Sequence, residues 1–248
     1  MMRWSPALRR LDWLVRRPIA HRGLHGGGIV ENTPSAFAAA IAGNYAIECD
    51  VQITRDGEAM VFHDETLDRL TTKTGRLRDH SAADLKTVAF KATTDRMQTL
   101  AELLDQVAGR VPLVIELKSH WDGDEQLAIR ALAVLEHCTC PYAIMSFDPD
   151  LIAAVRDMSP ATVRGIVADR AVDDYYKLLP LARRIELQSM SHLPRTTPDF
   201  ISYYFRDLPW PPVQRFRQAG GPVITWTARA PDHASPYADQ VTFEGYAA

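Results

Sequence analysis

The feature that most constrains the fold of this 248-residue chain is a regular alternation of short apolar runs with helix-like stretches. Several runs are rich in β-branched and aromatic residues and lack clean polar alternation. Runs of this kind are typical of parallel strands that are buried on both faces. The eight runs lie at residues 18–22, 45–53, 112–118, 142–147, 162–168, 199–205, 222–228 and 239–243.

Helical patterns lie between these runs. They cover residues 33–43, 99–108, 124–137, 148–158, 170–183, 209–219 and 231–238. Thr33 and Pro34 suit the N-cap and first position of the first of these helices. Eight strands with intervening helices predict a (β/α)8 barrel, which we expect to form a single domain over 1–248. A doubly wound open sheet is the alternative, because a count of strands does not show closure. Residues 184–190 fit either a ninth strand or the end of a helix.

One segment breaks the alternation after the second run. Residues 55–58 (Arg-Asp-Gly-Glu) indicate a turn, and residues 59–63 indicate an extra strand. The next clear helix begins near Thr99. We therefore expect a small insertion, at about 52–98, between the second and third barrel strands. It would lie at the end of the barrel where active sites form.

Charge and cysteine content narrow the partners and the compartment. The 28 basic and 31 acidic residues give a net charge of −3, which does not favour nucleic-acid binding. No run of 18 apolar residues is present, so no membrane span is expected. Three cysteines suit a reducing compartment, and the N-terminus lacks the apolar core of a signal peptide. These features predict a cytoplasmic protein.

The first residues form an amphipathic pattern of their own. Trp4, Leu8, Leu11 and Val15 recur at helical spacing, with arginines mostly around the other side. One interpretation is a helix that makes peripheral contact with anionic lipid. The other, which we favour, is a short helix that packs across the bottom of the domain.

Two short carboxylate motifs indicate a metal site. Side chains two positions apart on a strand share a face, so Glu48 and Asp50 point one way and Cys49 the other. Glu116 and Lys118 share a face in the same manner on the third barrel strand. Clustered buried carboxylates stay ionised only beside positive charge, and three of them would supply oxygen ligands for Mg²⁺ or Ca²⁺. Internal salt bridges, such as Glu116 with Lys118, are the alternative explanation.

Two histidines are predicted at strand ends around this cluster. His21 ends the first strand, and His63 ends the extra strand of the insertion. Together they form a candidate acid–base pair. Arg22 and Lys118 add fixed positive charge, which suits a phosphate group.

These residues lie in motifs that resemble the glycerophosphodiester phosphodiesterase family. The matching stretches are AHRG (20–23), ENTPSAF (31–37), IECDVQITRDGEAMVFHDETLDRLTTKTG (47–75), QTLAELLD (98–105) and LVIELK (113–118). Weaker similarity continues at 146–156 and 223–229. The match is nearly continuous from Ile19 to Lys118, and the family fold is a TIM barrel, in agreement with the pattern of runs.

The resemblance implies hydrolysis of glycerophosphodiesters to glycerol 3-phosphate and an alcohol. By matching position, Glu48, Asp50 and Glu116 would bind one divalent cation, Mg²⁺ or Ca²⁺. In the family-like mechanism the glycerol 2-hydroxyl attacks phosphorus and expels the alcohol, and water then opens the cyclic phosphate.

The resemblance also implies roles for the remaining residues. His21 and His63 would be the general acid and base, in an order that the sequence leaves open. Arg22 and Lys118 would neutralise the phosphate. The family usually ends its last strand with a TD-x-P-like segment, whereas this chain has VTFEGYAA, with Glu244 near the usual acidic position in a loose alignment.

Other functions are open at this point. A phospholipase-D-like or lysophospholipase-D enzyme would use the same residues on lipid phosphodiesters, including lysophospholipids. A catalytically silent barrel that serves as a binding protein is disfavoured, because no residue of the expected site has been lost.

Overall fold

The structure is a computed structural model that describes residues 8–248, so Trp4 lies outside the described residues. Eight parallel strands form a closed barrel. They are β1 (Ile19–Ala20), β2 (Ala46–Ile53), β4 (Leu113–Leu117), β5 (Tyr142–Ser146), β6 (Arg164–Ala168), β7 (Phe200–Tyr204), β8 (Val223–Ala228) and β9 (Gln240–Phe243). Closure runs through β1, where Ile19 pairs with Ala46 of β2 and with Thr242 of β9. The prediction of a (β/α)8 barrel is confirmed, and the open sheet is excluded.

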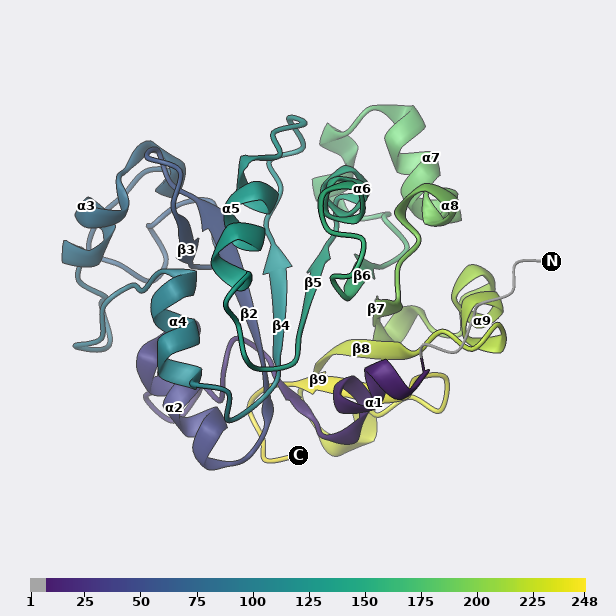
Figure 1. Cartoon of the computed structure of the whole chain (residues 1–248), viewed down its shortest axis with the longest axis horizontal. Helices are drawn as coiled ribbons and strands as arrows, with labels where there is room; N and C mark the ends of the chain where they lie inside the picture. Colours follow the sequence, from purple (N-terminus) through teal and green to yellow (C-terminus); the bar gives the residue numbers. More distant parts are fainter. Residues whose placement is uncertain (1–7) are drawn as a thin grey trace.

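Helices surround the barrel and connect its strands (Figure 1). The longer ones are α2 (Pro34–Ala42), α4 (Leu100–Val107), α5 (Gln126–Leu135), α6 (Pro149–Met158), α7 (Leu181–Ser189) and α9 (Pro211–Gln218), and α8 (Leu193–Thr196) is a single turn. Helix α2 begins as predicted, because the Thr33 hydroxyl accepts a hydrogen bond from the backbone of Ala36 and Pro34 follows it.

Two predicted helices are wrong, and proline explains both. The stretch 170–183 contains a short 3-10 helix, Asp174–Leu178, and α7 begins only after Pro180. Proline lacks the amide that would continue a preceding helix, and it restricts the residue before it. Helix α7 ends at Ser189, so the stretch 184–190 is the end of a helix and not a strand. In 231–238 only Pro231–His233 is helical, because Pro236 disfavours helical backbone at Ser235.

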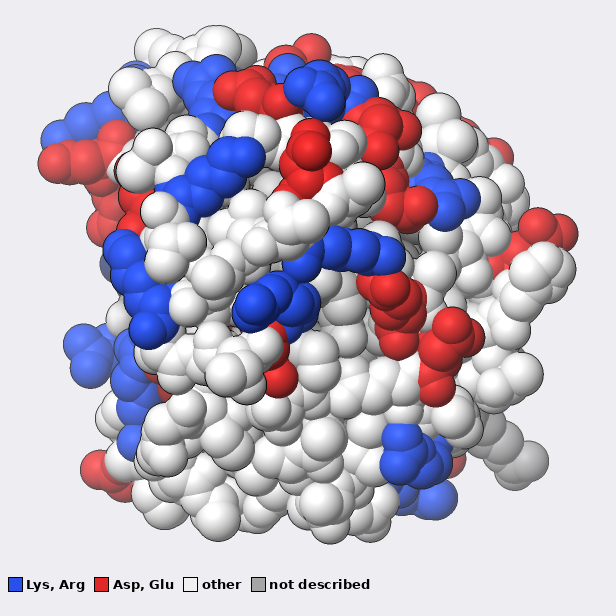
Figure 2. All heavy atoms as spheres, turned by 90° about the vertical axis from the view of Figure 1, so that its left-hand side faces the viewer, with Lys and Arg blue, Asp and Glu red and all other residues white. Residues whose placement is uncertain are grey.

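The segment between β2 and α4 covers one side of the barrel mouth. It contains β3 (Ala59–Val61), antiparallel to β2, a 3-10 helix (Leu77–Asp79) and α3 (Ala82–Thr87). These elements enclose a small core of their own around Met60, Phe62 and Leu67. Figure 2 faces this side of the molecule and shows acidic and basic side chains interspersed over its upper part, without one continuous field.

The barrel bottom is closed by α1 (Leu8–Arg16). Leu11 and Leu14 of this helix are buried in a cluster that also contains Ile19, Val114 and Phe200 from the barrel strands. Among the described residues, then, the helix packs across the barrel as the favoured interpretation expects. No helix in residues 8–248 is long and apolar enough to cross a membrane.

Candidate active site

Three buried carboxylates meet where β2 and β4 lie side by side. Asp50 is in register with Glu116, and Glu48 precedes Asp50 on the same face of β2. Glu48, Asp50 and Glu116 each offer a carboxylate oxygen within 4.8 Å of the other two. Cys49 points the opposite way and is buried in the hydrophobic core. The alternation predicted from the strand pattern thus gathers these carboxylates at the barrel mouth.

The three carboxylates repel one another, and a bound cation would relieve this repulsion. Burial, together with the charges of Asp50 and Glu116, raises the pKa of Glu48 well above its usual value. The Oε1 atom of Glu48 is buried and has no hydrogen-bond partner. An orphaned oxygen beside two further carboxylates is a suitable donor set for a hard divalent ion such as Mg²⁺ or Ca²⁺. The residues present therefore fit a metal of this kind.

Two permanent cations flank the carboxylates. The Nζ atom of Lys118 lies 2.7 Å from Glu116 Oε1 and 3.3 Å from Asp50 Oδ1. Arg22 Nε lies 3.3 Å from Asp50 Oδ2. Burial alone would raise the pKa of Asp50, but Lys118 and the neighbouring positive groups hold it far below its usual value. The salt bridge between Glu116 and Lys118, the alternative explanation from the sequence, thus forms within the carboxylate cluster.

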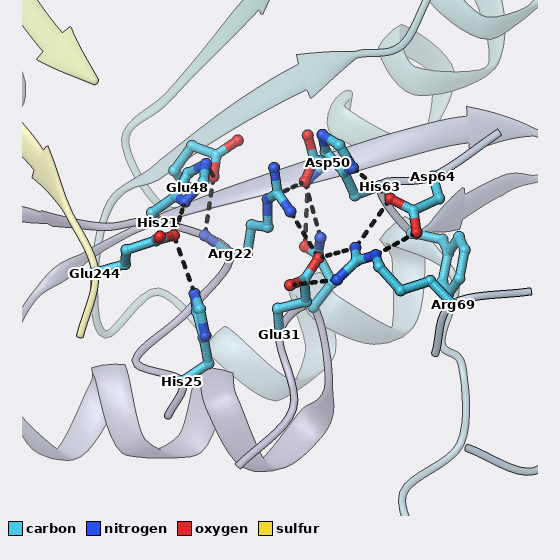
Figure 3. A network of polar contacts seen from close by, with 12 residues as sticks. His21, Arg22, His25, Glu31, Glu48, Asp50, His63, Asp64, Arg69 and Glu244 are labelled. Carbon is cyan, nitrogen blue, oxygen red and sulfur yellow. Dashed lines mark hydrogen bonds and ion pairs between the residues drawn. The ribbon is translucent and has the colours of Figure 1, made fainter. Parts of the chain in front are cut away.

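His21 follows β1 and is held by the carboxylate of Glu244, which directly follows β9. Its Nδ1 atom lies 2.6 Å from Glu244 Oε2, and its Nε2 atom lies 3.9 Å from Glu48 Oε2 (Figure 3). His25 Nε2 lies 3.5 Å from the same Glu244 oxygen. Hydrogen bonds with both imidazoles lower the pKa of Glu244, and burial lowers the pKa of His21. Glu244 therefore orients His21 so that Nε2 faces the carboxylates.

His63 has an equivalent partner within the insertion. Its Nδ1 atom lies 2.7 Å from Asp64 Oδ1, and Asp64 in turn accepts hydrogen bonds from the guanidinium of Arg69. The same guanidinium reaches Glu31, whose Oε1 atom also lies 2.6 Å from Arg22 Nη1. A continuous chain of hydrogen bonds and ion pairs thus links His63 to Arg22, as Figure 3 shows.

The loop after β1 brings backbone and side chains close to this network. Asn32, with a φ of 53°, donates from Nδ2 to Asp50 Oδ2 at 2.8 Å and accepts from the Asp50 amide. It thereby fixes a carboxylate of the cluster, while Thr33 caps the helix. Gly23 has a φ of 78°, and a Cβ there would approach the backbone of Ala36 to 2.8 Å. Only glycine allows α2 to pack this tightly against the loop.

A cavity of about 230 Å³ joins the predicted residues at the mouth. His21, Arg22, Glu48, His63, Glu116 and Lys118 all line it. Asp50 lies beneath, in contact with Lys118. Its opposite wall is aromatic, with Phe147, Tyr204 and Trp226. The structure thus brings all seven sequence-predicted site residues into one place.

Sequence reasoning missed several residues of this network. His25 had no distinctive setting in the sequence, and Arg69 and Asp64 were read only as part of the longer motif. Glu244 was placed near the family's usual acidic position only by a loose alignment, and no role was predicted for it. It lies 223 positions after His21, and the folded barrel identifies it as the partner of His21.

Comparison with known proteins gives a consistent match. The model of the glycerophosphoryl diester phosphodiesterase family matches residues 21–244. A glycerophosphodiester phosphodiesterase from Caldanaerobacter subterraneus subsp. tengcongensis is 37% identical over 125 residues, which are 46% of this chain and 51% of that protein. Another from Bacillus subtilis is 32% identical over 165 residues, 57% of this chain and 56% of that protein. The chain spans about half the length of these curated relatives.

Solved structures share the fold. A phosphodiesterase from Oleispira antarctica, in complex with the product sn-glycerol-3-phosphate, superposes with a TM-score of 0.75 at 20% identity and covers 92% of both chains. A glycerophosphodiester phosphodiesterase from Thermotoga maritima gives a TM-score of 0.70 at 24% identity, over 91% of this chain and 92% of that one.

Proposed function

The chain belongs to the glycerophosphoryl diester phosphodiesterase family, and on this premise we propose that it hydrolyses glycerophosphodiesters to glycerol 3-phosphate and an alcohol with the help of one divalent cation. One observation carries the proposal. Three buried carboxylates share a cavity with two histidines, each of which is tied at Nδ1 to a further carboxylate. A binding protein would have no need for two oriented imidazoles beside an anionic cluster.

The carboxylates are the proposed metal ligands. Glu48, Asp50 and Glu116 would hold Mg²⁺ or Ca²⁺, and a bound ion would supply Lewis-acid polarisation of a phosphate oxygen. Asn32 keeps Asp50 in place through two hydrogen bonds. Residues that contact a metal ligand commonly orient it in this way.

The histidines are the proposed general acid and base. Because their Nδ1 atoms are engaged by Glu244 and Asp64, the Nε2 atom of each is left for proton transfer. One imidazole takes the proton of the attacking hydroxyl, and the other delivers a proton to the departing alcohol oxygen. Such a pair contributes roughly 100- to 10,000-fold per residue to the rate.

Arg22 and Lys118 are the proposed phosphate-binding cations. Both are partly buried and already lie beside Asp50, so their charges are fixed at the cavity wall. Charge that develops on the phosphate oxygens would be stabilised without reorganisation of these groups.

The test is product analysis with purified protein. We expect release of glycerol 3-phosphate, or of its cyclic precursor, from glycerophosphocholine and glycerophosphoethanolamine in the presence of Mg²⁺ or Ca²⁺. His21→Ala and His63→Ala should each abolish turnover with an unchanged circular dichroism spectrum. His137→Ala, at an exposed position, is the matched control. No hydrolysis of any glycerophosphodiester, or near-normal rates in either histidine variant, would refute the proposal.

A further inference from the structure

The segment after β6 carries a row of exposed apolar side chains. Five of the eight large hydrophobic side chains that are exposed in the described part of the chain lie within residues 172–185. We call them the apolar rim; they are Val172, Tyr175, Leu178, Leu181 and Ile185, with exposed fractions of 65%, 57%, 84%, 63% and 54%. Single exposed apolar residues are ordinary, but a concentration of this kind marks an interaction surface.

The apolar rim belongs to a folded segment. Tyr176 and Leu187 point inward and form a small core with Ala171. The Tyr176 hydroxyl donates to Asp169 at 3.1 Å, and Trp121 Nε1 donates to the Tyr175 hydroxyl at 2.8 Å. The segment is therefore anchored by its inward residues, while the others are held out toward solvent.

On α7 the exposed positions form one stripe. Leu181 and Ile185 are separated by one helical turn and therefore lie on the same face. On another side the helix is attached by two ion pairs: Arg183 contacts Asp150 of α6, and Glu186 Oε1 lies 2.9 Å from Arg195 Nη2 of α8. The stripe thus has no partner within the described chain that would explain its apolar character.

The apolar rim borders the way into the candidate active site. A cavity of about 800 Å³ is lined on one side by Tyr175, Leu178 and Leu179, and on the other by His63 and Lys118. The last two residues also line the smaller cavity described above. In Figure 1, α7 lies at the end of the barrel toward which the arrows of β4 and β5 point, away from α1.

The charge of the segment favours a neutral surface. Asp173 and Asp174 are matched by Lys177 and Arg184, and Lys177 lies 2.6 Å from Asp174. The remaining charge, that of Arg183, is paired with Asp150 of α6. Residues 172–185 therefore lack a basic cluster of the kind that selects anionic lipid. A second copy of the chain seated on the apolar rim would obstruct the cavity beside it, whereas a lipid surface would present substrate to that cavity.

We propose that the apolar rim docks the barrel on a zwitterionic lipid surface, so that the phosphodiester of a lysophospholipid can reach the site through the adjoining cavity. The use of this contact in catalysis rests on the proposed function, but the contact itself does not require turnover. Lipid binding and hydrolysis of water-soluble substrates can therefore be measured separately.

The experiment compares wild-type protein with two double variants, each of which replaces two exposed apolar residues of helices. The rim variant, Leu181→Gln with Ile185→Gln, changes the apolar rim without changing the residues that line the cavity. The control, called the α5/α6 variant, is Ile129→Gln with Met158→Gln. These two residues are 53% and 42% exposed and also lie outside the cavity. Binding is measured by co-sedimentation with phosphatidylcholine vesicles that contain lysophosphatidylcholine. Hydrolysis is measured in parallel on those vesicles and on glycerophosphocholine in solution.

We expect wild-type protein and the α5/α6 variant to bind vesicles alike, and the rim variant to bind roughly tenfold or more weakly. The burial of one leucine side chain is worth about one tenfold step in affinity. Hydrolysis of the vesicle substrate should fall with binding, and that of glycerophosphocholine should stay within about twofold, because the site is untouched.

Equal vesicle binding by all three proteins, or none by wild type, would overturn the proposal. So would self-association of wild type that the rim variant abolishes, since a second copy would then cover the rim. If wild type does not hydrolyse glycerophosphocholine, that result would instead count against the proposed function.

Discussion

Glu244 shows how a single residue can complete a site that lies at the other end of the chain. It accepts from His21 at 2.6 Å, contacts His25 and also pairs with Arg229. The hydrogen bond raises the pKa of His21 against the larger, lowering effect of burial. We therefore regard Glu244 as a positioning residue, which acts on the reaction through His21.

Glu244→Gln is the corresponding test. Glutamine keeps the size of the side chain but removes the charge that orients and stabilises the imidazole. We expect kcat to fall roughly 100-fold or more, as for other carboxylates that orient a catalytic histidine, with little change in KM. Because the negative charge of Glu244, which raises the pKa of His21, is lost, the limb of the pH–rate profile that reports His21 should move to lower pH. A stability loss with an unchanged profile would point to a merely structural role.

At the scale of elements, the insertion is tied to the barrel through Arg69. Its guanidinium contacts Asp64 within the insertion and Glu31 on the loop after β1. Burial alone would raise the pKa values of Glu31 and Asp64. The hydrogen bonds and charge of Arg69, together with Arg22 beside Glu31 and His63 beside Asp64, outweigh burial and lower both pKa values. A carboxylate with a lowered pKa stabilises the folded state at neutral pH, and this contribution is lost as the pH falls through its folded pKa.

The stabilisation that Arg69 provides through Glu31 and Asp64 should therefore decrease at low pH. At pH 7 we expect Arg69→Met to lower the free energy of unfolding by about 0.5–1 kcal/mol, the usual size for ion pairs that are partly exposed. Below roughly pH 4, the ordinary carboxyl range, the difference between wild type and variant should shrink toward zero as both carboxylates protonate. Urea unfolding at several pH values measures this, and a difference that stays constant down to pH 3 would contradict it.

The elements also show what the sequence can and cannot predict. The eight barrel strands were readable because burial on both faces leaves near-continuous apolar runs. The helix at 170–183 was misplaced because Pro180 divides it, so that the local pattern belongs to two short elements. The exposed position of Leu178 and Leu181 could not be foreseen either, since an apolar residue in a helix pattern is ordinarily assigned to the core.

At the scale of the whole molecule, barrel closure is the step that local patterns do not contain. It depends on β1, which is only two residues long and pairs with strands near both ends of the chain. The candidate site likewise depends on residues that are distant in the sequence. The motif around Glu48 and Asp50 was distinctive, but Glu244, the partner of His21, was not. Helix α1 packs against the bottom of the closed barrel, with Leu14 fully buried among strand residues.

Closure should therefore depend on α1. Leu14→Ala leaves a cavity in the cluster at the barrel bottom, and we expect it to lower the free energy of unfolding by about 2–5 kcal/mol. Asp12→Ala, at an exposed position of the same helix, is the control and should change it by less than about 0.5 kcal/mol. Chemical unfolding gives both values. A cost for Leu14→Ala as small as that of Asp12→Ala would mean that α1 is not part of the cooperative fold.

The proposed activity depends on a divalent ion held by Glu48, Asp50 and Glu116. The most direct measurement is the rate of glycerol 3-phosphate release by metal-stripped protein as Mg²⁺ or Ca²⁺ is restored, in wild type and in Glu48→Gln. We predict no turnover without metal, saturable recovery in wild type, and a half-saturating concentration in Glu48→Gln that is roughly 100-fold higher or more, because loss of a ligand costs at least as much as loss of a supporting residue. Full activity after complete chelation, or identical metal curves for the two proteins, would contradict the account.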